Sequence, residues 1–149
     1  MDPSAVRLIR VYRLTTYVPA SHAERLEAAM LAAAPTPAGM RYDRVLWRCT
    51  AWQEQFRPLP GSQASAGEIG KIAVLPSVRI EMCLPHDRDL LARVIAEAIR
   101  PNHPWESPVI QIDEPLITAD GWCADHPGAE PYAATPPLSD PDVGGTRCR

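Results

Sequence analysis

Apolar and polar side chains alternate without a break between positions 78 and 84. The apolar residues are Val78, Ile80, Met82 and Leu84, and the residues between them are Arg79, Glu81 and Cys83. Successive side chains of a strand point to opposite faces of its sheet, so this pattern predicts a strand with one face in a core and the other uncovered. Sheets covered on one side only are typically antiparallel. The pattern therefore indicates an antiparallel sheet with helices on one face.

The segments around this strand repeat one order twice. Strands are expected at 6–18, 42–52, 78–84 and 109–112, where β-branched, aromatic and aliphatic residues gather or alternate. Helices are expected from the capping-box motif Ser21-His-Ala-Glu24 to Pro35, and from Asp87 or Asp89 to Pro101. Two strand–helix–strand halves side by side predict an α+β, ferredoxin-like β-α-β-β-α-β fold with both helices on one face.

Composition divides the chain into one domain and a tail. Residues 1–118 are long enough for a single core, whereas 119–149 are dense in proline, glycine, aspartate and alanine and hold little to bury. Residues 53–76 are rich in turn formers and predict a long excursion, of the kind that carries function or an interface. On the strand before it, the alternation places Trp47 in the core.

Charge and hydropathy argue against several kinds of partner. The net charge is −3 and the basic residues form no run or stripe, so nucleic acid is not expected as a partner. No apolar stretch approaches the ~20 residues of a membrane span, and the first residues make a poor signal peptide. We therefore expect a cytoplasmic protein that does not bind membranes, with its four cysteines reduced.

Two short segments resemble a known family. Phe56-Arg57-Pro58-Leu59-Pro60-Gly61, followed by Gly67-Glu68-Ile69-Gly70, resembles the signature loop of the YqfO (NIF-three-like) inserted domain. The turn His103-Pro104-Trp105-Glu106-Ser107-Pro108 is similar to the His-Pro-Tyr-Glu-Glu-Pro turn of that family and of CutA. Both families have the ferredoxin-like, PII-like fold, and the similarity extends over residues 8–115.

The resemblance implies an assembly and a place for ligands. It implies a homotrimer whose open sheet faces turn toward the threefold axis, with any small-molecule ligand in clefts between subunits. The two-metal site of full-length YqfO-type proteins lies in flanking domains, so hydrolase activity of that type is not expected from the residues of this one.

The departures from the family pattern indicate a changed pocket. The family has a glycine-rich Thr-x-Gly-x-Gly-x-Phe stretch before its Arg-Pro-Leu, and here residues 50–56 read TAWQEQF. Trp52, Glu54 and two glutamines thus supply an aromatic wall and hydrogen-bonding groups in place of bare backbone. In the turn, Trp105 and Ser107 replace tyrosine and glutamate. We interpret these changes as a pocket adapted to a partly apolar ligand.

His103 and Glu106 are candidates for acid–base catalysis. A histidine beside a carboxylate in a partly desolvated site can shuttle protons, because imidazole titrates near neutral pH. The alternative is that His103 caps the C-terminus of the preceding helix, where its cation suits the helix dipole. Glu54 and Glu68 are the other candidate acids or bases.

Arg57 and Glu68 flank the loop and have two interpretations. The guanidinium of Arg57 presents a rigid fork of donors that could bind an enolate or a carboxylate. The structural alternative is a salt bridge between Arg57 and Glu68 that holds the loop shut.

The aromatic residues near the loop, the turn and the tail also have two interpretations. They could line an apolar ligand pocket, or they could be buried at a trimer interface. The residues concerned are Trp52, Phe56, Trp105 and Trp122.

Two Cys-x-x-His pairs raise metal binding as an alternative. Cys83 with His86, and Cys123 with His126, combine thiolate and imidazole ligands that suit copper or zinc. Each pair supplies only two ligands, so no metal site is predicted. The sequence has no dinucleotide fingerprint, phosphate loop, nucleophile elbow or His-Glu-x-x-His motif, and no cofactor is predicted either.

Three functions are compatible with these features. The first is a small-molecule-binding protein that uses an intersubunit cleft, with the option of cofactor-free proton-transfer chemistry of the lyase, isomerase or cyclase type in a biosynthetic pathway. The second is a non-enzymatic trimeric sensor or divalent-metal-binding protein of CutA or PII type. The third is a pure assembly module.

Overall fold

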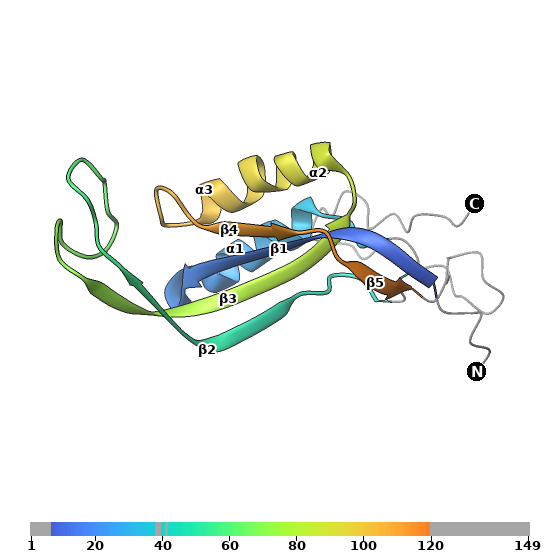
Figure 1. The fold of residues 1–149 in the computed structure, drawn as a ribbon, viewed down its shortest axis with the longest axis horizontal. Coiled ribbons are helices and arrows are strands. Elements are labelled where there is room, and N and C mark those ends of the chain that lie inside the picture. The colour runs from blue at the N-terminus through green and yellow to red at the C-terminus, as the bar shows by residue number, and fades with distance from the viewer. Residues whose placement is uncertain (1–6, 38–39, 41, 120–149) are drawn as a thin grey trace.

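A computed structural model describes residues 7–119, apart from 38–39 and 41 (Figure 1). The first half consists of β1 (Arg7–Pro19), the 3-10 turn η2 (Ala20–His22), α1 (Ala23–Ala33) and β2 (Trp47–Phe56). The second half consists of β3 (Ala73–Pro85), α2 (Arg88–Arg93), the π-helical segment η3 (Val94–Ile99), α3 (Arg100–Asn102), β4 (Ile110–Asp113) and β5 (Leu116–Ala119).

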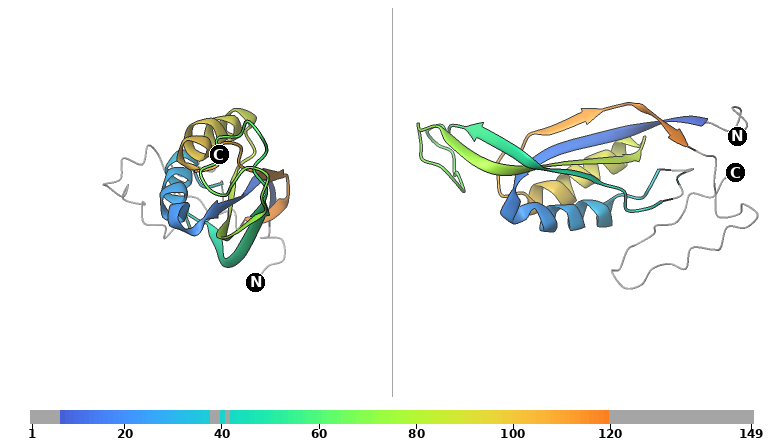
Figure 2. Two further views of the ribbon diagram at one scale, coloured as in Figure 1. Left: turned by 90° about the vertical axis from the view of Figure 1, so that its left-hand side faces the viewer. Right: turned by 90° about the horizontal axis from the view of Figure 1, so that it is seen from below.

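The strands form one antiparallel sheet in the order β2-β3-β1-β4, and β5 extends the β4 edge by pairing with the start of β1. Both helical segments cover the same face of this sheet, and the other face is open (Figure 2). The expected α+β class, with an antiparallel sheet and two helices, is confirmed. The short strand β5 was not expected from the sequence.

The core lies between the sheet and the helices. The alternation of β3 is confirmed, because Val78, Ile80, Met82 and Leu84 are buried whereas the residues between them face the open side. From β1, Leu14 and Val18 join this layer with no exposed surface. The helices contribute Leu26, Met30, Leu90, Val94 and Ile99.

The helix starts follow the sequence only in part. The Asp87 carboxylate caps α2 as expected, accepting the backbone N–H groups of Asp89 and Leu90. The capping box predicted at Ser21 is wrong, because a 3-10 turn precedes α1 and the Ser21 hydroxyl bonds the His22 ring instead. The second helix also continues past Pro101, which lies in the first turn of α3, where proline is tolerated.

The second strand is displaced from its expected range, and its sides are reversed. β2 covers Trp47–Phe56 rather than 42–52, so the excursion shortens to residues 57–72. The prediction that Trp47 is a core residue is wrong, since half of its surface is exposed on the open face. The cause is Arg48, whose side chain turns to the helix face and binds the buried Glu27 carboxylate of α1. Neighbouring residues of a strand must then point the other way.

The expected tail lies almost wholly outside the described residues. Trp122 and the Cys123/His126 pair fall in that part of the chain, so their predicted roles are not addressed by the structure. Within 7–119, apart from the short gaps, no helix has the length and apolar character needed to cross a membrane.

Candidate functional site

A β-bulge in β2 determines where Trp52 points. Cys49 pairs with Arg79 and Trp52 pairs with Ser77, so two residues of β2 stand opposite the single Val78 of β3. Such an extra residue shifts the alternation of every side chain beyond it. Without the bulge, Trp52 would share the helix-facing side of Arg48. With it, Trp52 lies on the open face.

Trp52 reaches across the middle strand to the strand beyond. Its indole stacks on the Tyr17 ring of β1, with the ring centroids 5.6 Å apart. Ser77 of β3 pairs with both flanking strands and lies between the two rings, almost fully buried. A small residue at this crossing leaves room for the indole. The result is an aromatic surface, formed by Tyr17 and Trp52, on the open side of the sheet.

Glu54 is held beside this aromatic surface. The Ser77 hydroxyl donates to Glu54 Oε2 at 2.9 Å and is also 3.2 Å from the Val18 carbonyl oxygen. The Glu54 side chain is partly exposed, and one of its oxygens is thus fixed by a buried hydroxyl. A carboxylate positioned next to an aromatic wall can accept a proton from a bound ligand and return it.

The two segments that carry the family resemblance meet in space. The Trp105 indole packs edge-on against the Phe56 ring, with centroids 4.8 Å apart. The Gln63 N–H donates to Glu106 Oε2 at 2.9 Å, and the Ser65 hydroxyl donates to the Pro104 carbonyl at 3.0 Å. We call these three contacts the loop–turn junction. It fastens the loop 57–72 to the turn 103–108.

Gly67 allows the loop to fold closely at the base of the junction. Its φ of +80° lies in the left-handed region that favours glycine, and a Cβ there would come within 3.3 Å of Phe56, Pro58 and Ala73. The glycine of the signature loop therefore has a structural reason in this chain.

His103 connects the turn to the sheet and is nearly buried. Its Nε2 lies 2.7 Å from the Tyr17 carbonyl oxygen, and its Nδ1 lies 3.1 Å from the Trp105 amide nitrogen. A carbonyl can only accept and an amide N–H can only donate, so these partners specify a neutral ring protonated at Nε2. The ring does not cap the preceding helix, as one interpretation proposed, because its partner is a strand carbonyl.

The surroundings of His103 favour this neutral form. Burial lowers the pKa of His103 below its ordinary value of 6.5, and His22 acts in the same direction. The hydrogen bond to Tyr17 and the charge of Glu54 oppose the effect without overcoming it. Since both ring nitrogens have partners, His103 positions the turn in this structure, and no ring nitrogen remains directed at a ligand.

The other candidate residues lie apart from Glu54. Glu106 accepts from the loop backbone, and Glu68 forms an ion pair with Lys71 rather than with Arg57. The salt bridge expected between Arg57 and Glu68 is therefore wrong. Arg57 is exposed and makes no hydrogen bond or ion pair with the rest of the described chain. Of the expected acid–base residues, only Glu54 adjoins the Tyr17–Trp52 surface.

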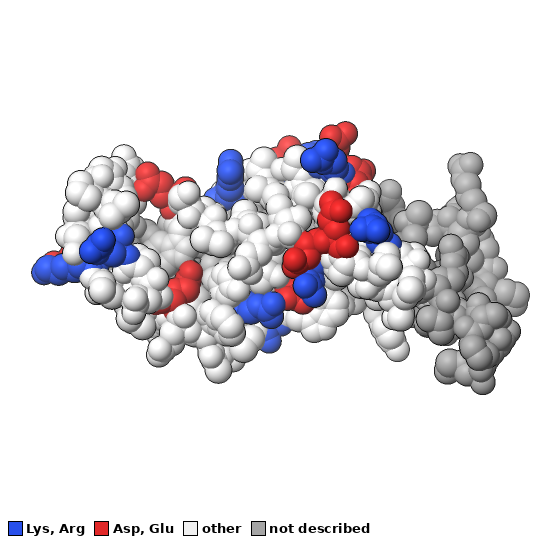
Figure 3. Space-filling model, viewed as in Figure 1, with Lys and Arg blue, Asp and Glu red and all other residues white. Residues whose placement is uncertain are grey.

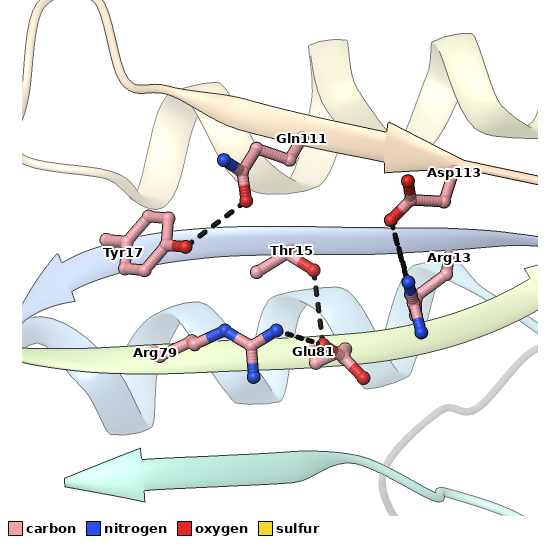
Figure 4. Close-up of polar contacts among 7 residues, drawn as sticks. All are labelled: Arg13, Thr15, Tyr17, Arg79, Glu81, Gln111 and Asp113. Atoms are coloured by element: carbon pink, nitrogen blue, oxygen red, sulfur yellow. Dashed lines mark hydrogen bonds and ion pairs between the residues drawn. The ribbon is translucent and has the colours of Figure 1, made fainter.

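The open face beyond the aromatic surface carries a polar network (Figure 4). Charged and neutral pairs join the strands across it. They are Arg13 with Asp113 at 3.0 Å, Arg79 with Glu81 at 2.5 Å, Thr15 with Glu81 at 3.3 Å, and Tyr17 with Gln111 at 3.2 Å. Acidic and basic side chains alternate on this side of the molecule, and no continuous field of one sign is visible (Figure 3).

The Cys83/His86 pair does not converge on one point. Cys83 lies on the open face opposite Arg13, whereas His86 stacks on the buried Tyr12 ring at 4.4 Å. Burial, and then the charge of Glu81, raises the pKa of the Cys83 thiol, which opposes the thiolate that a metal needs. The described residues contain no group of three or more potential ligands that could hold a metal ion.

A small cavity lies away from the aromatic surface. It is lined by the end of α1, the 34–37 segment, Met82, Cys83 and Ile117, and its volume is about 30 Å³. That is the space of about one water molecule. It is too small for an organic ligand, so a ligand on the open face would need walls from elsewhere.

Tyr17 and Ser77 are the site residues that sequence reasoning missed. Tyr17 reads as an ordinary strand aromatic and Ser77 as a strand-end residue. The signal that could have found Ser77 is its small size in the register position directly before the clear alternation of β3. Recognising it required the pairing of β2, which the bulge hides from the sequence.

Comparisons with known proteins locate the fold. No protein-family model and no curated protein matches the chain. The crystal structure of a Bacillus cereus protein related to NIF3 matches with a TM-score of 0.57 and 22% identity, over 76% of this chain and 28% of that one. This chain thus spans little more than a quarter of that protein's length.

Two structures of CPII, a nitrogen regulatory PII-like protein from Thiomonas intermedia, match as well. The apo form has a TM-score of 0.44 at 12% identity, over 76% of this chain and 97% of that one. The form bound to ADP, AMP and bicarbonate has a TM-score of 0.41 at 13% identity, over 74% and 96%. The resemblance to NIF3-related and PII-like proteins is thus confirmed, and at these identities it concerns the fold alone.

Proposed function

We propose that this protein binds a partly apolar organic molecule against the Tyr17–Trp52 surface, with Glu54 as the polar group that orients it. The observation that carries the proposal is the bulge in β2, which turns both Trp52 and Glu54 to one side. Ser77 then fixes the carboxylate beside the indole. Aromatic rings with one convergent polar group are the usual composition of small-molecule sites.

The same geometry supports proton-transfer chemistry without a cofactor. Glu54 would take a proton from an acidic C–H or O–H of the ligand and return it to another atom, as dehydration, isomerisation or addition-type cyclisation requires. Arg57 is exposed and unpaired within the described chain, and it is the cation we assign to a carboxylate or enolate of the ligand. Trp105, Phe56 and Glu106 support the site by holding the loop.

We further propose that the site is completed by other copies of the chain in a homotrimer. Trp47 and Trp52 are each about half exposed on the open face, at 50% and 41%. No helix of the described chain covers that face (Figure 2). Exposed indoles on an uncovered sheet favour an interface between subunits, which would supply the missing walls of a cleft.

A fragment screen by saturation-transfer NMR tests the binding proposal. Fragments that bind the native protein should lose their signal in the Trp52→Ala and Glu54→Gln variants and keep it in Tyr42→Ala, an exposed aromatic control on the same chain. The native fold of each variant is checked by its amide spectrum. Fragments that bind Trp52→Ala and Glu54→Gln as well as the native protein would contradict the assignment of the site.

A further inference from the structure

The loop–turn junction depends on one hydrogen bond of a titratable ring. The Trp105 amide N–H points at His103 Nδ1, which must be unprotonated to accept it. On the opposite side of the ring, Nε2–H is held by the Tyr17 carbonyl, so the ring cannot exchange its tautomer without losing both bonds. A second proton can therefore enter only at Nδ1.

We propose that His103 is a proton-operated latch for the loop 57–72: the neutral ring keeps the loop on the turn, and protonation at Nδ1 releases it. With a proton on Nδ1, two donors face each other, and the Trp105 amide has to move away. The backbone that moves carries all three contacts of the junction. They are the indole on Phe56, the carbonyl of Pro104 and the carboxylate of Glu106.

The charged groups around the ring act in opposite directions. Glu54 of β2 attracts an imidazolium at His103, and His22 of η2 repels one. On β1 the ring meets the uncharged backbone carbonyl of Tyr17. Once the turn has moved, a charged His103 retains the Tyr17 bond and gains from Glu54, so the released state has a means of holding the extra proton.

The latch would regulate the site proposed above, because Phe56 and Glu54 belong to the same strand, two residues apart. It rests on that proposal only for its biological meaning. The latch itself is a property of the unliganded protein and is measured without any ligand, so the two proposals fail separately.

NMR on the isotope-labelled full chain tests the latch. Long-range ¹H–¹⁵N spectra at pH 8 should show His103 as the Nε2–H tautomer. Phe56 is the only phenylalanine of the sequence, so its cross-relaxation with the Trp105 indole is an unambiguous measure of the closed junction. On acidification this signal and the Gln63 amide shift should change with the midpoint of the His103 ring. Below that midpoint the closed-to-open ratio should fall up to tenfold per pH unit, since one proton is taken up per opening.

Three variants sharpen the test. His103→Gln should abolish the pH dependence, and His22→Gln, the control histidine, should retain it. Ser65→Ala removes one contact of the junction and leaves the ring intact. It should raise the midpoint toward 6.5, because a weaker latch competes less well with the proton. It also serves as the test if His103→Gln does not fold.

Two results would overturn the latch. One is a His103 ring that titrates while the Phe56–Trp105 signal and the Gln63 shift stay unchanged through its midpoint. The other is a neutral Nδ1–H tautomer, because that ring could not accept from Trp105. A Ser65→Ala midpoint equal to that of the native protein would also contradict the coupling between ring and loop.

Discussion

Replacing Glu106 with alanine should loosen the loop 57–72 without unfolding the domain. The Glu106 carboxylate accepts the Gln63 N–H at 2.9 Å and joins the turn to the loop. A hydrogen bond to a charged acceptor contributes ~1.5–3 kcal/mol when it is protected from water. Glu106 is exposed, so water competes for both partners and we expect about 1 kcal/mol. A change of that size raises the open population about fivefold.

The single lysine of the chain provides the assay. Lys71 lies at the end of the loop with most of its side chain exposed, and a lysine-specific protease can cleave this chain nowhere else. When opening is fast relative to cleavage, the cleavage rate follows the open population. We therefore expect Glu106→Ala to be cleaved about five times faster than the native protein at pH 8, with an unchanged midpoint of global denaturation.

Matched variants separate the hydrogen bond from other effects. Glu106→Gln retains an acceptor oxygen and should be cleaved at a rate between those of the native and alanine forms. Glu97→Ala, an exposed glutamate on η3, should be cleaved like the native protein. Combining Glu106→Ala with Ser65→Ala should give a non-additive change, since both contacts hold the same loop. Equal cleavage rates for Glu106→Ala and Glu97→Ala would refute the reasoning.

Three further predictions concern the core, acid stability and assembly. Leu14→Ala removes a side chain with no exposed surface from the middle strand, and it should lower the free energy of unfolding by about 2–5 kcal/mol in urea titrations. Burial lowers the pKa of His103 in the folded state, so the unfolded chain binds more protons; stability should fall as pH drops below 6.5, and this part of the fall should vanish in His103→Gln. Light scattering should give the mass of three chains, and Trp47→Glu, which adds a charge to the exposed indole position of the open face, should shift the mass toward that of one chain. A native protein of single-chain mass would contradict the intersubunit cleft.

Much of the fold can be predicted because it depends on local rules. The alternation of 78–84 identifies the buried side of β3 without reference to any other segment, and the structure confirms each residue of it. The Asp87 cap is equally local, since its two partners lie two and three residues further on. The loop and the turn can be recognised from their residues alone, but their contact spans about forty positions of the chain and becomes visible only in three dimensions.

The site could not be predicted because it depends on long-range pairings. Trp47 faces outward because Glu27 on α1 needs a cation, and Arg48 can supply it only by turning inward. Trp52 reaches Tyr17 because a bulge reverses the alternation and because Ser77 leaves space beneath the indole. These conditions involve three strands and a helix at once, and no window of the sequence contains them.

His103 illustrates the division between sequence and structure. The sequence places a histidine after the helix, in a proline-rich turn, and this leaves two roles open: a proton shuttle or a helix cap. Its actual partner is the Tyr17 carbonyl, 86 positions earlier in the chain, and that contact exists only when β1 and the turn are packed together. By itself, the sequence determined the order of the elements and the buried side of β3. The tertiary structure alone decided which side chains share the open face and which protons they hold, because these depend on partners that only the folded chain brings within hydrogen-bonding distance.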